Sequence, residues 1–355
     1  MTRWLMFLFF LVTGLVLTFW RMLASGFTLI PRDNSDTRLL HYFLEHSYLW
    51  VTRTAPHLSF WDAPFFYPTT SVMAYSDLLV GGAFPYWFFR LFVEPHPSFG
   101  LWMLATSALN FLAFYLLLNR PLKCSALASC VGAYLFSFAH LRLTQFGHFQ
   151  LLPQYYIVIA VYALARLAQP DVIASFPRFR NWLVVFCAAF VLQLYTGFYF
   201  AWYFAFTMTG LAVYFLCHKR HRPLLLATAK QHAPSIAFVG GLSLLCLSPL
   251  LWHYIQHART AGYRGFSNMR HHLVPLRAWF YFGHENWFYA RLNELPYFQS
   301  VTGNIEKRLG LGFFTLGVAG AALWRRRREP VVGGAIILFV LIVTAVSRLP
   351  GKIEL

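Results

Sequence analysis

Long apolar stretches recur along almost the whole of this sequence, and they limit the folds that the chain can adopt. A helix that crosses a bilayer needs roughly 20 mostly apolar residues. Stretches that approach or exceed this length are Trp4–Trp20, Phe99–Leu118, Cys124–Ala139, Leu151–Leu167, Trp182–Cys217, Pro234–Tyr254, Leu309–Trp324 and Val331–Val346. The stretch Trp182–Cys217 is about twice one crossing, so it predicts a helical hairpin that turns near Tyr195–Tyr199. The expected fold is an all-α, polytopic transmembrane helical bundle with about nine spans.

The charge pattern predicts the orientation of these spans. Charged residues make up only 12% of the chain and hydrophobic residues 58%, which is the balance of an integral membrane protein. Lys and Arg gather on alternate short loops, at Arg3, Arg120, Lys123, Arg178, Arg180, Lys219, Arg220, Arg222 and Arg325–Arg328. Because short cytoplasmic loops accumulate Lys and Arg, these loops and the amino terminus are predicted to be cytoplasmic. The same pattern accounts for the net charge of +17 without a nucleic-acid partner.

The first predicted outer loop, 25–98, holds an unusual share of the acidic residues. The chain has only 12 Asp and Glu, and five of them fall between Arg32 and Asp77 in this loop, at Asp33, Asp36, Glu45, Asp62 and Asp77. A solvated loop would also attract acids, but this one is rich in Trp, Tyr, Phe and Pro, which favours a packed loop. Apolar residues at helical spacing after Asp36 predict a helix lying in the membrane interface. The segment 78–93 is assigned to the interface as well.

The second predicted outer loop, 254–308, is basic and aromatic. It carries Arg264, Arg270 and His271, and the short outer loop between the third and fourth spans adds Arg142 and His148. Positive charge on the outer side departs from the pattern of the inner loops, and an anionic ligand is a natural local cause. Two plainer alternatives stay open, namely contact with outer-leaflet headgroups and simple capping of helix ends.

Several common sites are absent from the sequence. It has no Walker motif, no glycine-rich nucleotide pattern after a strand, no serine nucleophile elbow and no metalloprotease signature. All five cysteines lie in or beside predicted spans, so they predict neither a disulfide framework nor a thiolate metal site. Nucleotide-dependent, protease and zinc chemistry are therefore disfavoured.

The layout resembles that of the GT-C superfamily of polytopic membrane glycosyltransferases. A carboxylate-rich outer loop follows the first span, and a second large outer loop precedes the eighth. The segments SDTRLLHYFLEH, WDAPFFYPTTSVMAYSD, RLTQFGHFQLLPQ and EKRLGLG are similar to those of a group of bacterial GT-C-like integral membrane proteins. The resemblance implies transfer of a sugar, with inversion, from a polyprenyl phosphate or diphosphate donor to a glycan, lipid or protein acceptor. It also implies a bacterial inner-membrane protein whose active side is periplasmic or extracellular.

Site residues follow from the resemblance and from the chemistry that such a transfer needs. Asp36 matches the family's acidic position best, with Asp33 as its neighbour, and both are the catalytic candidates. The departing phosphate needs cations, and the candidates are Arg264, Arg270, His271, Arg142 and His148. No cofactor is implied with certainty. A divalent cation, Mg²⁺ or Mn²⁺, held by Asp33 and Asp36 stays open, because hard cations prefer oxygen ligands.

Two other classes of function remain. A transporter or lipid flippase normally places ionisable groups within the bilayer, whereas the strongly polar residues of these spans are chiefly Asn110 and Gln193. A non-catalytic, lipid-binding GT-C-like subunit would keep the fold without the activity. The chain is expected to form one domain, 1–355. Many proteins of the similar group continue with more spans or an outer domain, so an acceptor-binding part beyond this sequence is left open.

Overall fold

The computed structural model is built almost wholly of helices. It describes residues 2–31, 36–139, 141–142, 145–262, 274–283, 286, 288–301, 307–329, 332–334, 336–337, 339–340, 343 and 347–348. The chain forms two compact units, which are described separately. The first contains Met1–Phe138, Phe146–Ala205 and Pro223–Gly262, and the second contains Ala139–Gln145, Phe206–Arg222 and Tyr263–Leu355.

Helices of the first unit carry most of the apolar sequence. They are α1 (Arg3–Ala24), α2 (Asp36–Val51), α3 (Phe84–Arg90), α4 (Pro95–Asn119), α5 (Ala126–Phe138), α7 (Tyr155–Leu167), α8 (Pro170–Ile173), α9 (Phe176–Thr196) and α12 (Ala233–Ala261), with short 3-10 turns η1 (Val72–Tyr75), η2 (Val80–Gly82) and η3 (Phe149–Leu151). Two helices cross the boundary between the units, α10 (Phe198–Cys217) and α11 (Arg222–Gln231).

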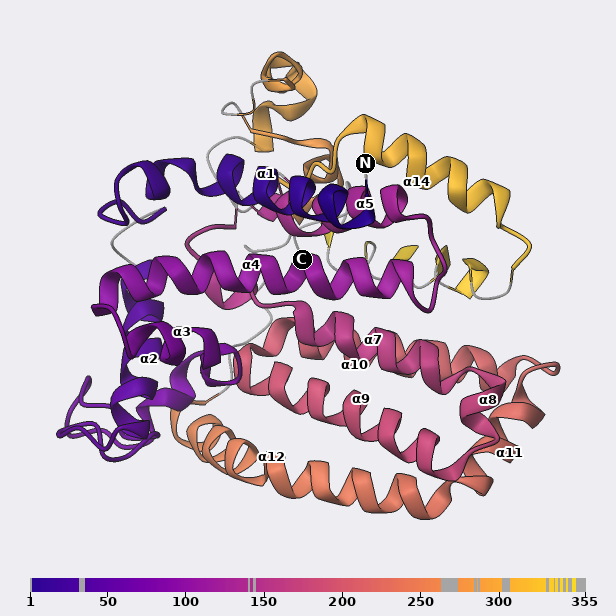
Figure 1. Ribbon diagram of the computed structural model, residues 1–355, viewed down its shortest axis with the longest axis horizontal. Helices are drawn as coiled ribbons and strands as arrows, with labels where there is room; N and C mark the ends of the chain where they lie inside the picture. The colour runs from indigo at the N-terminus through magenta and orange to yellow at the C-terminus, as the bar shows by residue number, and fades with distance from the viewer. Residues whose placement is uncertain are drawn as a thin grey trace, which may run out of the picture. The chain divides into compact units, whose positions relative to one another are not determined.

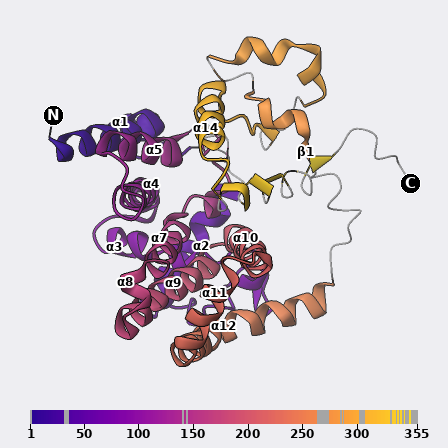
Figure 2. The same cartoon turned by 90° about the vertical axis from the view of Figure 1, so that its right-hand side faces the viewer.

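The long helices of the first unit lie side by side. In Figure 1, α1 and α5 are followed by α4, α7, α9 and α12, with their axes roughly aligned. Each helix contacts the next one in this row. The view in Figure 2 looks along several of these helices and shows the same neighbours. The segment that holds α2 and α3 packs at one end of the row, beside the start of α4.

Five described helices are long and apolar enough to cross a membrane by length and composition, namely α1, α4, α9, α10 and the Ala233–Thr260 part of α12. This finding indicates a membrane protein, in agreement with the sequence. Helices α5, α7 and α14 have 13 residues each, or about 20 Å, which is less than the thickness of a hydrocarbon core. Half of the residues in the predicted Val331–Val346 span lie outside the described residues. The nine spans and their orientation therefore stay predictions.

The predicted hairpin in Trp182–Cys217 is present as two helices. Helix α9 ends at Thr196, Gly197 has an extended backbone, and α10 begins at Phe198. The ring of Phe204 lies 6.1 Å from the rings of both Phe186 and Phe190, so the start of α10 turns back along α9. The break falls inside the range that the length argument gave.

Helix α12 continues without interruption through Pro249. A proline has no N–H, so the carbonyl of Leu245 one turn earlier loses its usual partner. The hydroxyl of Ser248 donates to that carbonyl at 2.8 Å. The adjacent carbonyl of Cys246 accepts a hydrogen bond from the Tyr195 hydroxyl of α9 at 2.7 Å. The helix therefore runs past the predicted end of the span at Tyr254, as far as Ala261.

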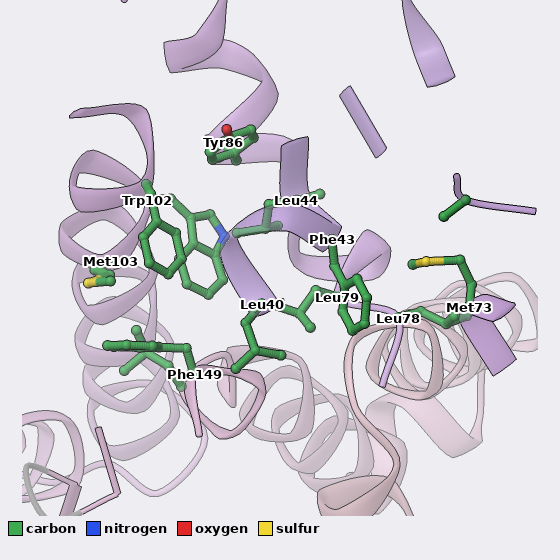
Figure 3. Close-up of a cluster of buried hydrophobic side chains, with 14 of the residues drawn as sticks. Leu40, Phe43, Leu44, Met73, Leu78, Leu79, Tyr86, Trp102, Met103 and Phe149 are labelled. Atoms are coloured by element: carbon green, nitrogen blue, oxygen red, sulfur yellow. The ribbon is translucent and has the colours of Figure 1, made fainter. Parts of the chain in front are cut away.

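A buried cluster joins α2 to the helices around it. Figure 3 shows side chains from α2, η1, the residues just before η2, α3, α4 and η3 converging on one region. Its fully buried members include Leu40, Phe43, Leu44, Met73, Leu78, Leu79, Tyr86, Trp102, Met103 and Phe149. The Trp102 indole N–H, also buried, donates to the Gly82 carbonyl at 2.8 Å. Gly81 permits a second close approach, because an added Cβ would lie 2.2 Å from the Leu192 carbonyl of α9.

The second unit contains its own small cluster. Its described elements are η4 (Leu276–Phe280), η5 (Ala290–Glu294), η6 (Pro296–Val301), α14 (Phe313–Arg325) and a two-residue parallel pairing of β1 (Val274–Pro275) with β2 (Ser347–Arg348). Ala278, Tyr281, Phe298 and Val301 are buried together. The prediction of a single domain is not tested by this division.

Candidate functional site

Asp36 is the first residue of α2, and its carboxylate is close to a histidine from a distant segment. Its Oδ2 lies 3.4 Å from Nδ1 of His148, and the side chains are 52% and 30% exposed respectively. Two of the residues that the sequence singled out, one as a base and one as a cation, are therefore neighbours. The carboxylate stays accessible to solvent while it is paired.

His148 owes its position to a tight turn between α5 and α7. Gly147, immediately before it, has φ +112°, a conformation that side chains rarely adopt. Phe149, immediately after it, is 1% exposed and contacts Phe99 of α4 with ring centroids 5.5 Å apart. The ring of Phe146 stacks on Phe19 of α1. The turn is fastened to the core on both sides of His148, and this fixes the histidine opposite the start of α2.

His41 and Glu45 of α2 are only partly exposed, and both have partners on other segments. The Arg90 guanidinium lies 3.1 Å from Glu45, and the buried Tyr86 hydroxyl donates to Glu45 Oε2 at 2.6 Å. His41 Nε2 lies 3.0 Å from the Pro95 carbonyl at the start of α4. Burial, and then the bond to Glu45, raise the pKa of Tyr86. These bonds fasten α2 to α3 and α4.

A histidine pair holds the chain that follows α2. His46 is fully buried, and its Nε2 lies 2.9 Å from the Phe60 carbonyl, which can only accept, so Nε2 carries a proton. Its Nδ1 lies 2.8 Å from Nδ1 of His57. In the neutral pair the bare His46 Nδ1 accepts from a protonated His57 Nδ1. Burial lowers the pKa of both rings, which favours this neutral arrangement.

Asp77 stabilises the break between α9 and α10. Its Oδ1 accepts a hydrogen bond from the Phe198 backbone N–H at 2.8 Å, which satisfies one of the free donors at the start of α10. The side chain is 6% exposed, and burial raises the pKa of Asp77. The acid that the sequence included in its loop cluster thus has a structural role in helix capping.

The intramembrane polar residues also have structural partners. The Asn110 amide donates to the Leu152 carbonyl at 2.8 Å and accepts from the Gln154 N–H at 3.0 Å. Gln193 donates to the Pro153 carbonyl at 3.4 Å. Both side chains are fully buried and hold the turn that enters α7. Their hydrogen bonds satisfy backbone groups of an irregular segment, so these residues have a structural role and do not indicate a transport pathway.

Most of the other predicted site residues are not among those that the structure describes. Asp33, Arg264, Arg270 and His271 lie outside the described residues. Arg142 belongs to the second unit, whereas Asp36 and His148 belong to the first, so its role beside them stays a prediction. Across the part of the chain that the structure describes, no group of three His, Cys, Asp or Glu side chains could hold a metal ion. Because Asp33 lies outside the described residues, the Asp33–Asp36 metal site stays a prediction.

Sequence reasoning passed over a second cluster, where the first loop meets the end of α12. It contains Trp61, Asp62, Ser71 and Tyr75 from the loop and His253 and His257 from α12. The two histidines are four residues apart, and this spacing at the end of a span was the available signal.

Comparison with known proteins identifies a family but no activity. A family model described as a domain of unknown function, DUF6311, matches residues 6–351, and the chain belongs to this family. No curated protein and no solved structure matches the chain.

Proposed function

We propose that this DUF6311 protein is a membrane glycosyltransferase that takes a sugar from a polyprenyl phosphate or diphosphate donor. Asp36 acts as the general base on the acceptor hydroxyl, and cations stabilise the departing phosphate. The observation that carries the proposal is the pairing of Asp36 with His148 at 3.4 Å, with the carboxylate still half exposed. The GT-C resemblance supports the reaction class, and the five long apolar helices support a lipid-linked donor at the membrane.

The arrangement suits a displacement at an anomeric carbon. A carboxylate within reach of the acceptor hydroxyl takes its proton as the new C–O bond forms, while the bond to the donor phosphate breaks. When protonated, His148 is a cation beside that carboxylate, and it can donate to a phosphate oxygen as charge develops there. The cations Arg264, Arg270, His271 and Arg142 belong to the same proposal. Within it, the acceptor is a glycan, lipid or protein, and the active face is the outer one.

Transfer activity tests the proposal directly. Membranes containing the full chain are incubated with polyprenyl-phosphate-linked [¹⁴C]glucose or [¹⁴C]mannose, and label that becomes resistant to mild acid is counted. We expect Asp36→Asn to lose transfer and Asp171→Asn to keep it. Asp171 is a matched control because it is 54% exposed and also paired, with Arg178 at 3.6 Å. Full transfer by a folded Asp36→Asn protein would contradict the proposed role.

The cation assignment has its own test. An arginine that binds phosphate through its planar fork is not replaced by lysine, whereas general attraction to lipid headgroups tolerates the exchange. We expect Arg270→Lys and Arg264→Lys to lose on the order of a hundredfold in transfer rate, nearly as much as the alanine variants. Wild-type rates in both lysine variants would favour the headgroup reading.

A further inference from the structure

Two close ring contacts, one stacked and one tilted, join the first loop to the end of α12. The Trp61 and His253 rings are 4.0 Å apart between centroids with an interplanar angle of 16°, and Tyr75 and His257 are also 4.0 Å apart. His253 and His257 are one helical turn apart, so they share a face of α12. The loop therefore presents two aromatic side chains along one side of the helix end.

Hydrogen bonds connect polar groups of the loop to His253 and to one another. The Ser71 hydroxyl shares a hydrogen bond with His253 Nδ1 at 2.9 Å. Asp62 accepts from the Ser71 N–H at 2.7 Å and from the Ser59 hydroxyl at 2.8 Å. The Tyr254 hydroxyl donates to the Ser76 carbonyl and holds the chain next to Tyr75. The cluster is built by contacts between segments about 180 residues apart, as the separation of 182 between Ser71 and His253 shows.

The cluster is not simply a piece of core. Tyr75 is 50% exposed and Phe66, whose ring lies 6.2 Å from Tyr75, is 65% exposed. Asp62 is exposed as well. A surface that combines open aromatic rings with a carboxylate, a hydroxyl and imidazoles can contact apolar and hydrogen-bonding groups at once.

The charges narrow the class of ligand. The Asp62 carboxylate disfavours an anion such as phosphate, and it would be costly against hydrocarbon. The described residues here supply too few ligands for a metal ion. A neutral molecule with apolar faces and many hydroxyl groups fits best, and those are the properties of a sugar ring, whose C–H faces stack on aromatic rings while its hydroxyls bind acceptors and donors.

We propose that Trp61, Asp62, Ser71, Tyr75, His253 and His257 form a binding subsite for a neutral carbohydrate. Tyr75, with Phe66 beside it, stacks on a sugar face, and Asp62 accepts hydrogen bonds from sugar hydroxyls through its remaining lone pairs. As the acceptor subsite it rests on the proposed glycosyltransferase function. Carbohydrate binding itself, however, is measurable without any transfer.

Titration calorimetry on the full chain in lipid nanodiscs tests the subsite, with cellotetraose and maltotetraose as probes and glycerol 1-phosphate as the anionic comparison. A maltoside detergent is avoided because its headgroup is itself a sugar. We expect saturable binding of one tetrasaccharide at millimolar concentration or below, and about tenfold weaker binding for Tyr75→Ala. Asp62→Asn, which can keep the bond from the Ser71 N–H, should weaken binding by a smaller factor.

Phe88→Ala is the matched control, because Phe88 is 59% exposed on α3 and away from the cluster. Thermal unfolding of each variant confirms that it folds. The inference is overturned if neither tetrasaccharide binds, if glycerol 1-phosphate binds more tightly, or if Phe88→Ala weakens binding as much as Tyr75→Ala. Sugar binding without any transfer would instead contradict the proposed enzyme function and support the carbohydrate subsite.

Discussion

Helix α2 carries two carboxylates in contrasting surroundings. Glu45 is 18% exposed and is held by both Arg90 and Tyr86, whereas Asp36 is 52% exposed and faces His148 at a longer distance. A carboxylate whose lone pairs are occupied by buried donors has little left to offer a substrate. The comparison teaches that two acids on one helix can differ in exposure: Glu45 is enclosed by its partners, whereas Asp36 stays accessible to solvent.

Removing the charge of Asp36 should have the largest effect. Asp36→Asn keeps the shape of the side chain but removes the base, so the transfer rate should fall by about 100-fold or more. The thermal unfolding midpoint should change little, because the side chain is half exposed. Because Asn caps a helix about as well as Asp, an Asp36→Asn protein with an unchanged midpoint and full transfer would leave Asp36 only a capping role.

Glu45→Gln should lower stability and leave the transfer rate unchanged, the reverse of Asp36→Asn. It weakens charge-assisted hydrogen bonds to Arg90 and Tyr86 in a partly buried place, and this should cost about 2 kcal/mol of unfolding free energy. Transfer per folded molecule should be unchanged. The variant and the wild type are compared in the same nanodiscs. Equal unfolding midpoints would show that Glu45 does not stabilise the fold and would contradict the prediction.

The histidines of α2 predict a moderate dependence of stability on pH. Burial lowers the pKa of His41 and His46 on α2, and of their neighbour His57, below the usual value near 6.5. The unfolded chain therefore takes up protons first, so stability is fully present above about pH 6.5 and falls as the pH drops toward the lowered values. Unfolding midpoints between pH 7.5 and 5 should show this loss, and His57→Asn should reduce it. A midpoint that rises on acidification would contradict the assignment.

Substitutions of Asp77 should change the free energy of unfolding least. Burial raises the pKa of Asp77, so its charge is disfavoured where it lies. Asp77→Asn keeps an acceptor for the Phe198 N–H and should change stability by less than about 0.5 kcal/mol, whereas Asp77→Ala should cost about 1 kcal/mol. Unfolding in nanodiscs compares the two, and equal losses would mean that the charge itself matters at the helix break.

Hydropathy and spacing predicted a good part of this fold. The helical, membrane-type architecture, the break near residue 197 and a helix after Asp36 all follow from the length and period of apolar runs. Period alone could not show that His46 and Ser47 would be fully buried, because burial of a polar group depends on partners such as Phe60 and Trp87. Those partners lie on other segments.

The candidate site shows the same limit. Acid clustering pointed to the first loop, and the structure brings Asp36 and His148 together. The stacking of Trp61 on His253 joins residues that no local pattern connects, so only the tertiary arrangement could reveal it. The prediction also placed Asp77 among the loop acids, and its bond to Phe198 separates it from them.

The hydrogen bond from Phe198 to Asp77 has a consequence for how the chain is made. Asp77 precedes its partner by 121 residues, so it leaves the ribosome long before α10 exists. When α10 is synthesised, the carboxylate that accepts from the Phe198 N–H has therefore already been made. The helix pair α9–α10 is therefore not structurally self-sufficient, since a chain beginning after α4 would lack the Asp77 acceptor for the Phe198 N–H.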